Sequence, residues 1–354
     1  RPPRSTLSSS SAASDVYKRQ TVSIPLSFAV KGEFSVSVNL FKLLAAALTG
    51  RKSERSVILS QRDNFPSDLY IAEGLIKLLR EHGISAELRL VAAENLEESI
   101  AQSPDVLLLT HVNFRTGKVH DMQRLTELAH DHDLQVIWDL SHSAGVMALE
   151  LDDCQVDFAV GCGYKFLNGG PGAPAFLYVA SRLQAKLQHP LQGWMGHRQP
   201  FAFEPEYAPD VGINQLQTGT PCILSMSALD AALSCFEGLT ATQLREKSLA
   251  LSAMFLSLLE GDPACESLTL VSPREPKQRG AQLSFSHSDA FPISQALIEA
   301  GVIVDFRAPN LLRLGFSPLF LSFDEIARSA AILKQTLSEG RFRQERFSVR
   351  AKVT

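Results

Sequence analysis

The sequence predicts an α/β protein in which a three-layer, mostly parallel sheet forms a large domain and a small α+β domain follows it. Short, continuous apolar segments of strand length alternate with longer segments of helical periodicity, and this alternation is typical of parallel strands covered by helices on both faces. The chain has 354 residues, of which 45% are hydrophobic and 20% are charged. We expect a chain of this length to bury a separate core in each domain.

Each element of the large domain follows from a local pattern. Continuous apolar runs predict strands at residues 56–60, 86–91, 105–112, 134–142, 156–162 and 173–180. Helical periodicity predicts helices over 38–48, 68–83 and 122–133, the second of them closed by Gly83. Residues 190–221 lack any regular period, which favours a long loop with a functional or interface role.

The rest of the chain has the pattern of a smaller α+β domain. Helices are predicted over 226–239 and 244–261, strands over 282–287, 302–306 and 311–316, and a last helix opens with a capping box from Ser322 to Glu325. We place the large domain at 34–230, the small C-terminal domain at 231–354 and an atypical segment at 1–33. The first 20 residues are rich in Ser and basic residues, so we expect a transit peptide or sequence from a gene boundary.

Charge and cysteine content exclude several classes of protein. A net charge of −4 argues against nucleic acid as the main partner, and no apolar run approaches the roughly 18 residues of a membrane span. Five cysteines without a CxxC pair predict free thiols in a reducing compartment, with neither a disulfide framework nor a zinc site. A metal or serine hydrolase that uses His111, His120 or His142 is disfavoured because no HExxH or GxSxG motif is present.

Polar residues at the ends of strands predict where a ligand binds, because open α/β sheets bind ligands beyond the carboxyl ends of their strands. Thr110 ends one predicted strand, and Asp139 and His142 end the next. Tyr164 and Lys165 follow a third strand. We expect all five side chains to share one crevice.

Lys165 and Asp139 suggest the chemistry of that crevice. Lys165 lies between glycine-rich clusters, which allow a ligand to approach the backbone closely. A lysine amine can form a Schiff base with a carbonyl cofactor, and pyridoxal phosphate enzymes combine it with an acidic residue for the pyridinium nitrogen. Each residue also has a purely structural alternative. Lys165 could extend from a turn into solvent, and Asp139 could cap the turn that follows it.

Three further positions fit the same hypothesis. The helix that opens near Ser37 could offer backbone donors to a phosphate, although Ser37 could equally serve only as its cap. Phe65 could stack on a pyridine ring or pack on the core. Arg313, on an otherwise apolar strand, could bind a substrate carboxylate in bidentate fashion or be an ordinary edge-strand arginine.

The sequence resembles the bacterial type of kynureninase, a family of pyridoxal phosphate enzymes with the aspartate aminotransferase fold. The segments that carry the resemblance are NFPSDLYIAEGL (64–75), LTHVNFRTGKVHDM (109–122), WDLSHSAG (138–145), GYKFLNGGPGAPAFLYV (163–179), GWMGH (193–197) and LLRLGFSPLF (311–320). The match covers roughly residues 34–354, and YKFLNGGPG is its most specific motif.

The resemblance implies a role for each candidate residue. Lys165 would form the Schiff base, Asp139 would hold the pyridine nitrogen, and Tyr164 would protonate the substrate. The implied cofactor-binding residues are Val36, Ser37, Phe65, Asp68, Thr110, Asp139, His142, Tyr164, Lys165, Trp194 and Thr220. Trp194 and Thr220 would reach across the interface of a homodimer. Arg313 would bind the substrate carboxylate.

The implied reaction hydrolyses the Cβ–Cγ bond of L-kynurenine, or of its 3-hydroxy form, to anthranilate and L-alanine in tryptophan catabolism. Two departures from the family bear on it. The sequence lacks an upstream Leu-Asp-Gly-Asn-Ser-Leu-Gly-type segment, and Val36 replaces a usual hydroxyl residue. The alternatives are therefore an N-terminally truncated, non-catalytic chain and another lyase or desulfurase of the same fold, for which Cys265 lacks a convincing context.

Overall fold

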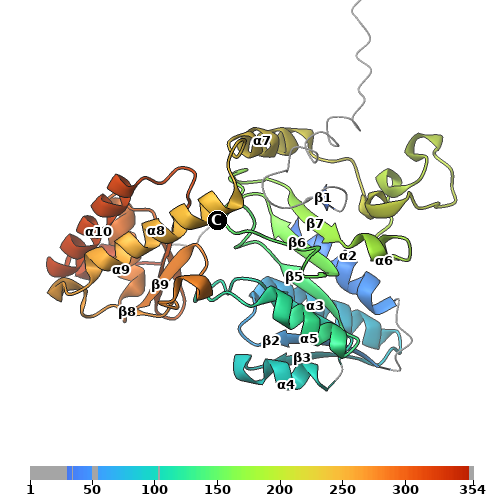
Figure 1. Cartoon of the computed structure of the whole chain (residues 1–354), viewed down its shortest axis with the longest axis horizontal. Helices are drawn as coiled ribbons and strands as arrows, with labels where there is room; N and C mark the ends of the chain where they lie inside the picture. The colour runs from blue at the N-terminus through green and yellow to red at the C-terminus, as the bar shows by residue number, and fades with distance from the viewer. Residues whose placement is uncertain (1–29, 34, 50–54, 103, 351–354) are drawn as a thin grey trace, which may run out of the picture. The chain divides into compact units, whose positions relative to one another are not determined.

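The computed structural model describes residues 30–33, 35–49, 55–102 and 104–350, which form two compact units (Figure 1). The first unit contains the described residues up to His111 together with His120–Thr240. The second contains Val112–Val119 and the described residues from Ala241 onward. The predicted atypical segment falls almost entirely on residues 1–29, which lie outside the described residues.

In the described part of the first unit, seven strands form one sheet in the order β1-β7-β6-β5-β4-β2-β3. The strands are β1 (Val30–Glu33), β2 (Ser56–Gln61), β3 (Ala86–Val91), β4 (Val106–Thr110), β5 (Gln135–Asp139), β6 (Phe158–Cys162) and β7 (Ala175–Val179). The strands from β3 to β6 pair in parallel, and β7 runs antiparallel to both of its neighbours. The predicted mostly parallel sheet is thus confirmed. The direction of β7 reverses because its connection from β6 contains no helix to carry a crossover.

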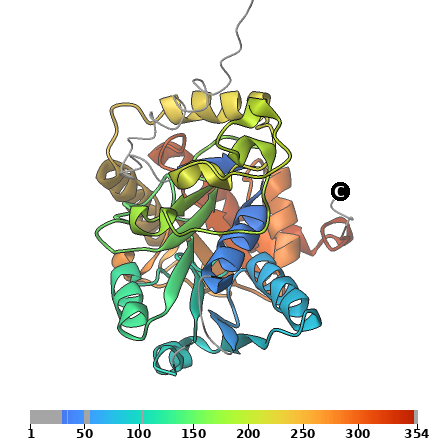
Figure 2. The same ribbon diagram turned by 90° about the vertical axis from the view of Figure 1, so that its right-hand side faces the viewer.

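Helices cover both faces of this sheet. They are α2 (Val36–Thr49), α3 (Pro66–Glu81), α4 (Leu96–Ile100), α5 (Met122–Asp131), α6 (Ser181–Gln184) and α7 (Ile223–Ser234). Figure 2 shows α2 and α3 on one side of the sheet and α5 on the other. Leu40 and Leu44 of α2 pack with Val160 of β6 in one buried cluster. On the α5 side, the indole Nε1 of Trp138 donates to Thr126 Oγ1 at 3.1 Å.

The segment after β7 is irregular, as predicted, and contains short 3₁₀ helices. These are η2 (Trp194–Gly196), η3 (Pro200–Ala202) and η4 (Gly212–Leu216). The turn at η2 packs directly on the chain that follows η4. The approach is so close that a Cβ added at Gly193 would lie 2.1 Å from the Thr218 carbonyl oxygen. Only glycine allows this approach, so the two ends of the segment are held together.

The second unit is built on a smaller sheet. Its described residues form four antiparallel strands in the order β10-β11-β9-β8. The elements are β8 (Thr269–Leu270), β9 (Gln282–Ser286), β10 (Asp305–Arg307), β11 (Leu311–Gly315), α8 (Ala241–Leu259), α9 (Ala290–Glu299) and α10 (Phe323–Ser338). The predicted capping box is confirmed, since Ser322 Oγ accepts from the Glu325 N–H and Glu325 Oε2 accepts from the Ser322 N–H. The short 3₁₀ helices of this unit are η5 (Pro263–Cys265), η6 (Pro276–Gln278), η7 (Arg341–Arg343) and η8 (Glu345–Phe347), whereas η1 (Ala93–Asn95) belongs to the first unit.

The short elements β1, β8, α4 and α6 were not predicted, and three further differences from the sequence-based expectation have local reasons. The strand predicted over 134–142 ends at Asp139, whose Oδ1 accepts from the Ser141 N–H at 2.7 Å and starts a turn. The strand predicted over 302–306 starts late, because the Val302 N–H donates to the Leu297 carbonyl and closes α9. Helix α9 itself was missed because it carries a proline, which its first turn tolerates.

Among the residues that the structure describes, no helix is both long and apolar enough to cross a membrane.

Candidate active site

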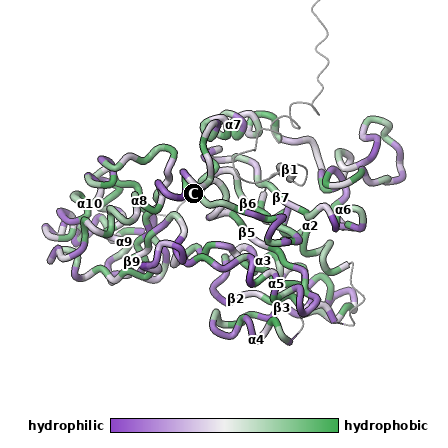
Figure 3. Tube along the Cα trace, viewed as in Figure 1, coloured by the Kyte–Doolittle hydropathy of each residue, from purple (hydrophilic) through white to green (hydrophobic). Residues whose placement is uncertain are grey.

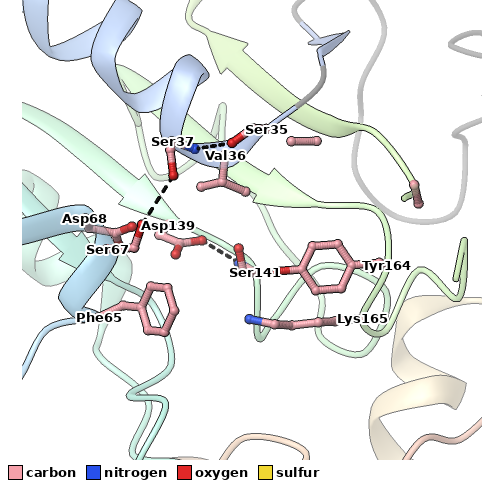
Figure 4. Close-up of a pocket in the computed structure, with 12 residues that line it drawn as sticks. Ser35, Val36, Ser37, Phe65, Ser67, Asp68, Asp139, Ser141, Tyr164 and Lys165 are labelled. Carbon is pink, nitrogen blue, oxygen red and sulfur yellow. Dashed lines mark hydrogen bonds between the residues drawn. The ribbon is translucent and has the colours of Figure 1, made fainter. Parts of the chain in front are cut away.

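A pocket in the first unit collects most of the residues predicted from the strand ends (Figure 4). Its walls come from the start of α2, the start of α3 and the segments that follow β5 and β6. The lining residues are Ser35, Val36, Ser37, Phe65, Ser67, Asp68, Asp139, Ser141, Tyr164, Lys165, Ala173 and Ala175. The parallel pairing of β5 with β6 places Asp139 beside Val160, so both strands end at the same edge of the sheet.

Close backbone packing fixes the loop that carries Lys165. The loop folds on itself through a hydrogen bond from the Gly169 N–H to the Gly163 carbonyl, at 2.9 Å. The turn after β5 lies against it at Gly145, where φ is +90° and a Cβ would lie 2.5 Å from the Phe166 carbonyl oxygen. A side chain at position 145 would therefore push the Lys165 loop away from the end of β5.

The amine of Lys165 has a histidine and two aromatic rings as neighbours. Its Nζ lies 3.0 Å from His142 Nε2, and it is 5.6 Å from the ring centroid of Phe65 and 5.9 Å from that of Tyr164. Figure 4 shows the side chain extending toward Phe65. The protonated amine would donate to His142, which must then have its Nε2 unprotonated.

Two carboxyl groups lie buried in the same pocket. The exposed fraction is 2% for Asp68 and 4% for Asp139. Burial raises the pKa of Asp68 well above its usual value, the charge of Asp139 raises it further, and Lys165 opposes the rise. Oδ2 of Asp68 makes no hydrogen bond to any described residue. A buried acidic pair with an unused oxygen is suited to a cationic N–H donor from a ligand.

The start of α2, in contrast to the acidic pair, favours an anionic group of a ligand. The Ser37 N–H donates to Ser35 Oγ at 3.1 Å, and the hydroxyl groups of Ser37 and Ser67 are hydrogen-bonded at 3.2 Å. Backbone N–H groups and hydroxyls at the N-terminus of a helix bind anions. The pocket can therefore hold an aromatic ligand that carries both an anionic group and a protonated ring nitrogen.

Tyr164 lines the pocket with about half of its surface exposed. Its pKa is raised to about 12, mainly by burial and secondarily by the neighbouring thiol of Cys162. Burial also raises the pKa of Cys162. The phenol therefore keeps its proton through the neutral range and can donate it.

The structure places other predicted residues away from these walls. Thr110 is buried at the end of β4, where its N–H donates to Asn64 Oδ1 at 2.8 Å. His142 reaches the pocket through its contact with Lys165. Trp194 and Thr220 do not line the pocket of their own chain, and Arg313 belongs to the second unit. The roles predicted for Thr110, Trp194, Thr220 and Arg313 stay predictions.

The histidines considered for other hydrolases have different surroundings. His111 is buried with its ring edge toward Trp138, at 6.0 Å between centroids. His120 Nε2 lies 3.0 Å from Gln61 Oε1. Within the described ranges, no group of three or more His, Cys, Asp or Glu side chains could hold a metal ion.

Sequence reasoning missed three serines of the pocket, Ser35, Ser67 and Ser141. Each is separated by one residue from a predicted site residue: Ser37, Phe65 and Asp139, respectively. A serine two positions from a predicted site residue, at the start of a helix or after a strand, was the only local pattern that could have indicated these three residues. Serine is too common in turns for the spacing to stand out without the structure.

Comparison with known proteins gives consistent matches. The family model described as the kynureninase C-terminal domain matches residues 244–333. The kynureninase of Pseudomonas fluorescens is 44% identical over 324 residues, which cover 90% of this chain and 77% of that protein. The kynureninase of Deinococcus radiodurans is 47% identical over 305 residues, which cover 86% of this chain and 73% of that protein.

Among solved structures, the apo cysteine desulfurase from Thermococcus onnurineus NA1 is similar with a TM-score of 0.78. The alignment covers 94% of this chain and 86% of that chain, at 16% sequence identity. At this identity the similarity concerns the fold alone.

The raised pKa of Asp68 predicts a pH-dependent effect on stability. Because the folded chain holds this proton more tightly than the unfolded chain, the contribution of Asp68 is full below about pH 4 and is lost as the pH rises through the folded-state pKa. Asp68→Asn cannot ionise, so we expect its Tm without added ligand to exceed that of the wild type by roughly a few degrees at pH 8 and by less at pH 5. Asp63→Asn, which changes an exposed carboxyl group of the same segment, is the control. An equal Tm difference at both pH values would contradict the prediction.

Proposed function

The chain belongs to the kynureninase family, and we infer from this membership that it is a pyridoxal phosphate-dependent hydrolase that cleaves the Cβ–Cγ bond of L-kynurenine to anthranilate and L-alanine. One observation carries the assignment to this site. A single pocket combines the amine of Lys165, the buried carboxyl groups of Asp68 and Asp139, and the donor-bearing start of α2. No ordinary structural need brings these groups together in a cleft.

The residues present fit the cofactor. The unused Oδ2 of Asp68 and the carboxylate of Asp139 suit a protonated pyridine nitrogen. The backbone of Val36 and the hydroxyl of Ser37 suit the phosphate, and Phe65 suits the face of the ring. When bound through Lys165, pyridoxal phosphate supplies an electron sink for the negative charge that develops on the substrate.

The chain's own side chains perform the proton transfers. Once the substrate amine has displaced it from the cofactor, the free amine of Lys165 moves the proton of the substrate Cα, and its contact with His142 orients it for this step. Asp139 would hold the pyridine nitrogen of the cofactor from its buried position in the pocket. Tyr164 protonates Cβ after water has added to the γ-carbonyl carbon and the Cβ–Cγ bond has broken. The phenol holds its proton at neutral pH, as an ordinary tyrosine does, and the rise of its pKa to about 12 makes it a weaker acid.

A desulfurase would need a reactive cysteine, and Cys265 does not suit that role. The residue is buried at η5, and burial raises the pKa of its thiol. A thiol needs a low pKa and access to act as a nucleophile. Kynurenine hydrolysis, which the family membership supports, is the function that we favour.

The proposed assembly is a homodimer in which Trp194 and Thr220 complete the partner's site. A cluster of exposed aromatic rings supports this: Phe201 is 69% exposed and Phe203 is 77% exposed, and both rings contact Trp194. Figure 3 shows α7 as a mostly hydrophobic helix, and its residue Leu224 is 85% exposed. Exposed apolar surface of this kind marks an interaction site.

We place the enzyme in the cytoplasm, in tryptophan catabolism and the supply of precursors for NAD.

Lys165→Ala tests the assignment. We expect anthranilate formation from L-kynurenine to fall by about 10³-fold or more, since Lys165 is the only lysine among the described residues that line the pocket. Borohydride should trap the cofactor on the wild-type chain and not on the variant, as measured by mass spectrometry. Lys186→Ala, which changes an exposed lysine of the same unit, should behave like the wild type. Trapping at another lysine would refute the site.

A second prediction concerns the homodimer. Phe201→Ser combined with Phe203→Ser should raise the dissociation constant of the dimer by about 10-fold or more, because two apolar side chains leave the proposed interface. Sedimentation velocity over a range of concentrations measures this constant. Phe320→Ser, at a position with 66% exposure in the second unit, is the control. A wild-type chain that is monomeric at micromolar concentration would contradict the proposal.

A further inference from the structure

Arg313 is held by a specific set of acceptors within the second unit. Strands β10 and β11 pair antiparallel with Asp305 opposite Arg313. Nη2 of Arg313 donates to Asp305 Oδ2, and Nη1 donates to the Phe114 carbonyl oxygen at 2.5 Å. Only 11% of the Arg313 side chain is exposed. The guanidinium is thus fixed by one acceptor from β10 and one from the segment 112–119.

A second arginine holds Asp305 in turn. Nη2 of Arg307 donates to the same Oδ2 atom at 2.9 Å. The two guanidinium groups and the single carboxylate leave a net charge of +1 on this trio. Burial lowers the pKa of Arg313, and Asp305 counteracts this effect most strongly. Without Asp305, a largely buried cation would lose its main electrostatic support.

The arrangement leaves donors of Arg313 available. A guanidinium has five N–H groups, and the two contacts use one on each terminal nitrogen. A carboxylate is bound most strongly by two parallel N–H groups held in a fixed plane. The two acceptors, one on each terminal nitrogen, fix that plane, whereas a single contact would allow the side chain to rotate.

We propose that Asp305, supported by Arg307, is a positioning residue that holds the guanidinium of Arg313 in place to bind the α-carboxylate of an amino-acid substrate. The substrate would present one carboxylate to Arg313. The proposal deepens the proposed function and rests on it, because it takes Arg313 as the residue that binds the substrate carboxylate. A net charge of +1 complements one carboxylate. Asp305 then acts on substrate affinity only through Arg313.

The second unit contains a natural control for an ordinary ion pair. Glu299 also lies between two arginines, Arg346 at 2.6 Å and Arg341 at 4.0 Å. This cluster is largely exposed, and such pairs contribute little to stability. Glu299→Gln removes the same charge by the same chemistry as Asp305→Asn.

The test measures ligand binding to the cofactor-loaded chain by the change in its visible absorbance. L-alanine carries the carboxylate, and propylamine is a matched amine without it. For Asp305→Asn we expect the Kd of L-alanine to rise about 10-fold, with propylamine within about 2-fold of the wild type. Asp305→Glu should restore most of the affinity for L-alanine, and Glu299→Gln should change neither ligand. The KM for L-kynurenine should rise with little change in kcat.

A double-mutant cycle separates positioning from a general structural role. Arg313→Gln should weaken L-alanine binding by about 100-fold, and adding Asp305→Asn should then change nothing further. Equal losses for L-alanine and propylamine, or additive effects in the cycle, would overturn the positioning role.

The two proposals fail in different ways. A wild type that cleaves L-kynurenine without any dependence on Asp305 would contradict the positioning role alone. A wild type with Asp305-dependent L-alanine binding but without anthranilate formation would contradict the proposed reaction alone.

Discussion

The parallel pairing of β5 with β6 is the constraint on which the site depends. It brings Asp139 and the loop that carries Lys165 to one edge of the sheet, so that an acidic group and an amine enter the same pocket. The second carboxyl, from Asp68, turns that acidic wall into a site that prefers to hold a proton or a cation. Parallel strands need crossover helices, and one of these, α2, brings the N–H and hydroxyl groups of its first turn to the pocket. The parallel arrangement of the strands therefore provides both the acidic wall, which suits a cationic group, and the start of α2, which suits an anionic group.

The reversal of β7 is as important as the parallel strands. A helical crossover after β6 would carry the chain away from the edge, whereas the glycine-rich return keeps Tyr164 and Lys165 beside the end of β5. The packing of Gly145 against the Phe166 carbonyl then fixes the distance between the two loops. Rigid backbone positioning of this kind is what catalytic groups require to act together.

Much of this could be predicted from the sequence, for definite physical reasons. Apolar runs and helical periods depend on burial, so they predicted the sheet and the edge where Asp139 and Lys165 meet. The start of β10 could not be predicted, because it is decided by the hydrogen bond that Val302 makes to the end of α9. The contact of Ser67 with Ser37 joins residues 30 positions apart in the sequence, and the local spacing of Ser67 from Phe65 is too common to reveal it. The pairing of Asp305 with Arg313 likewise follows from strand register.

In the proposed holoenzyme, the buried acidic pair of Asp68 and Asp139 holds a protonated pyridine nitrogen opposite the amine of Lys165. The most direct measurement is the ¹⁵N chemical shift of ring-labelled pyridoxal phosphate bound to the wild type and to Asp139→Asn. The account predicts a protonated nitrogen in the wild type at pH 8 and loss of that proton in the variant. An unprotonated nitrogen in the wild type, or an identical shift in both proteins, would contradict it.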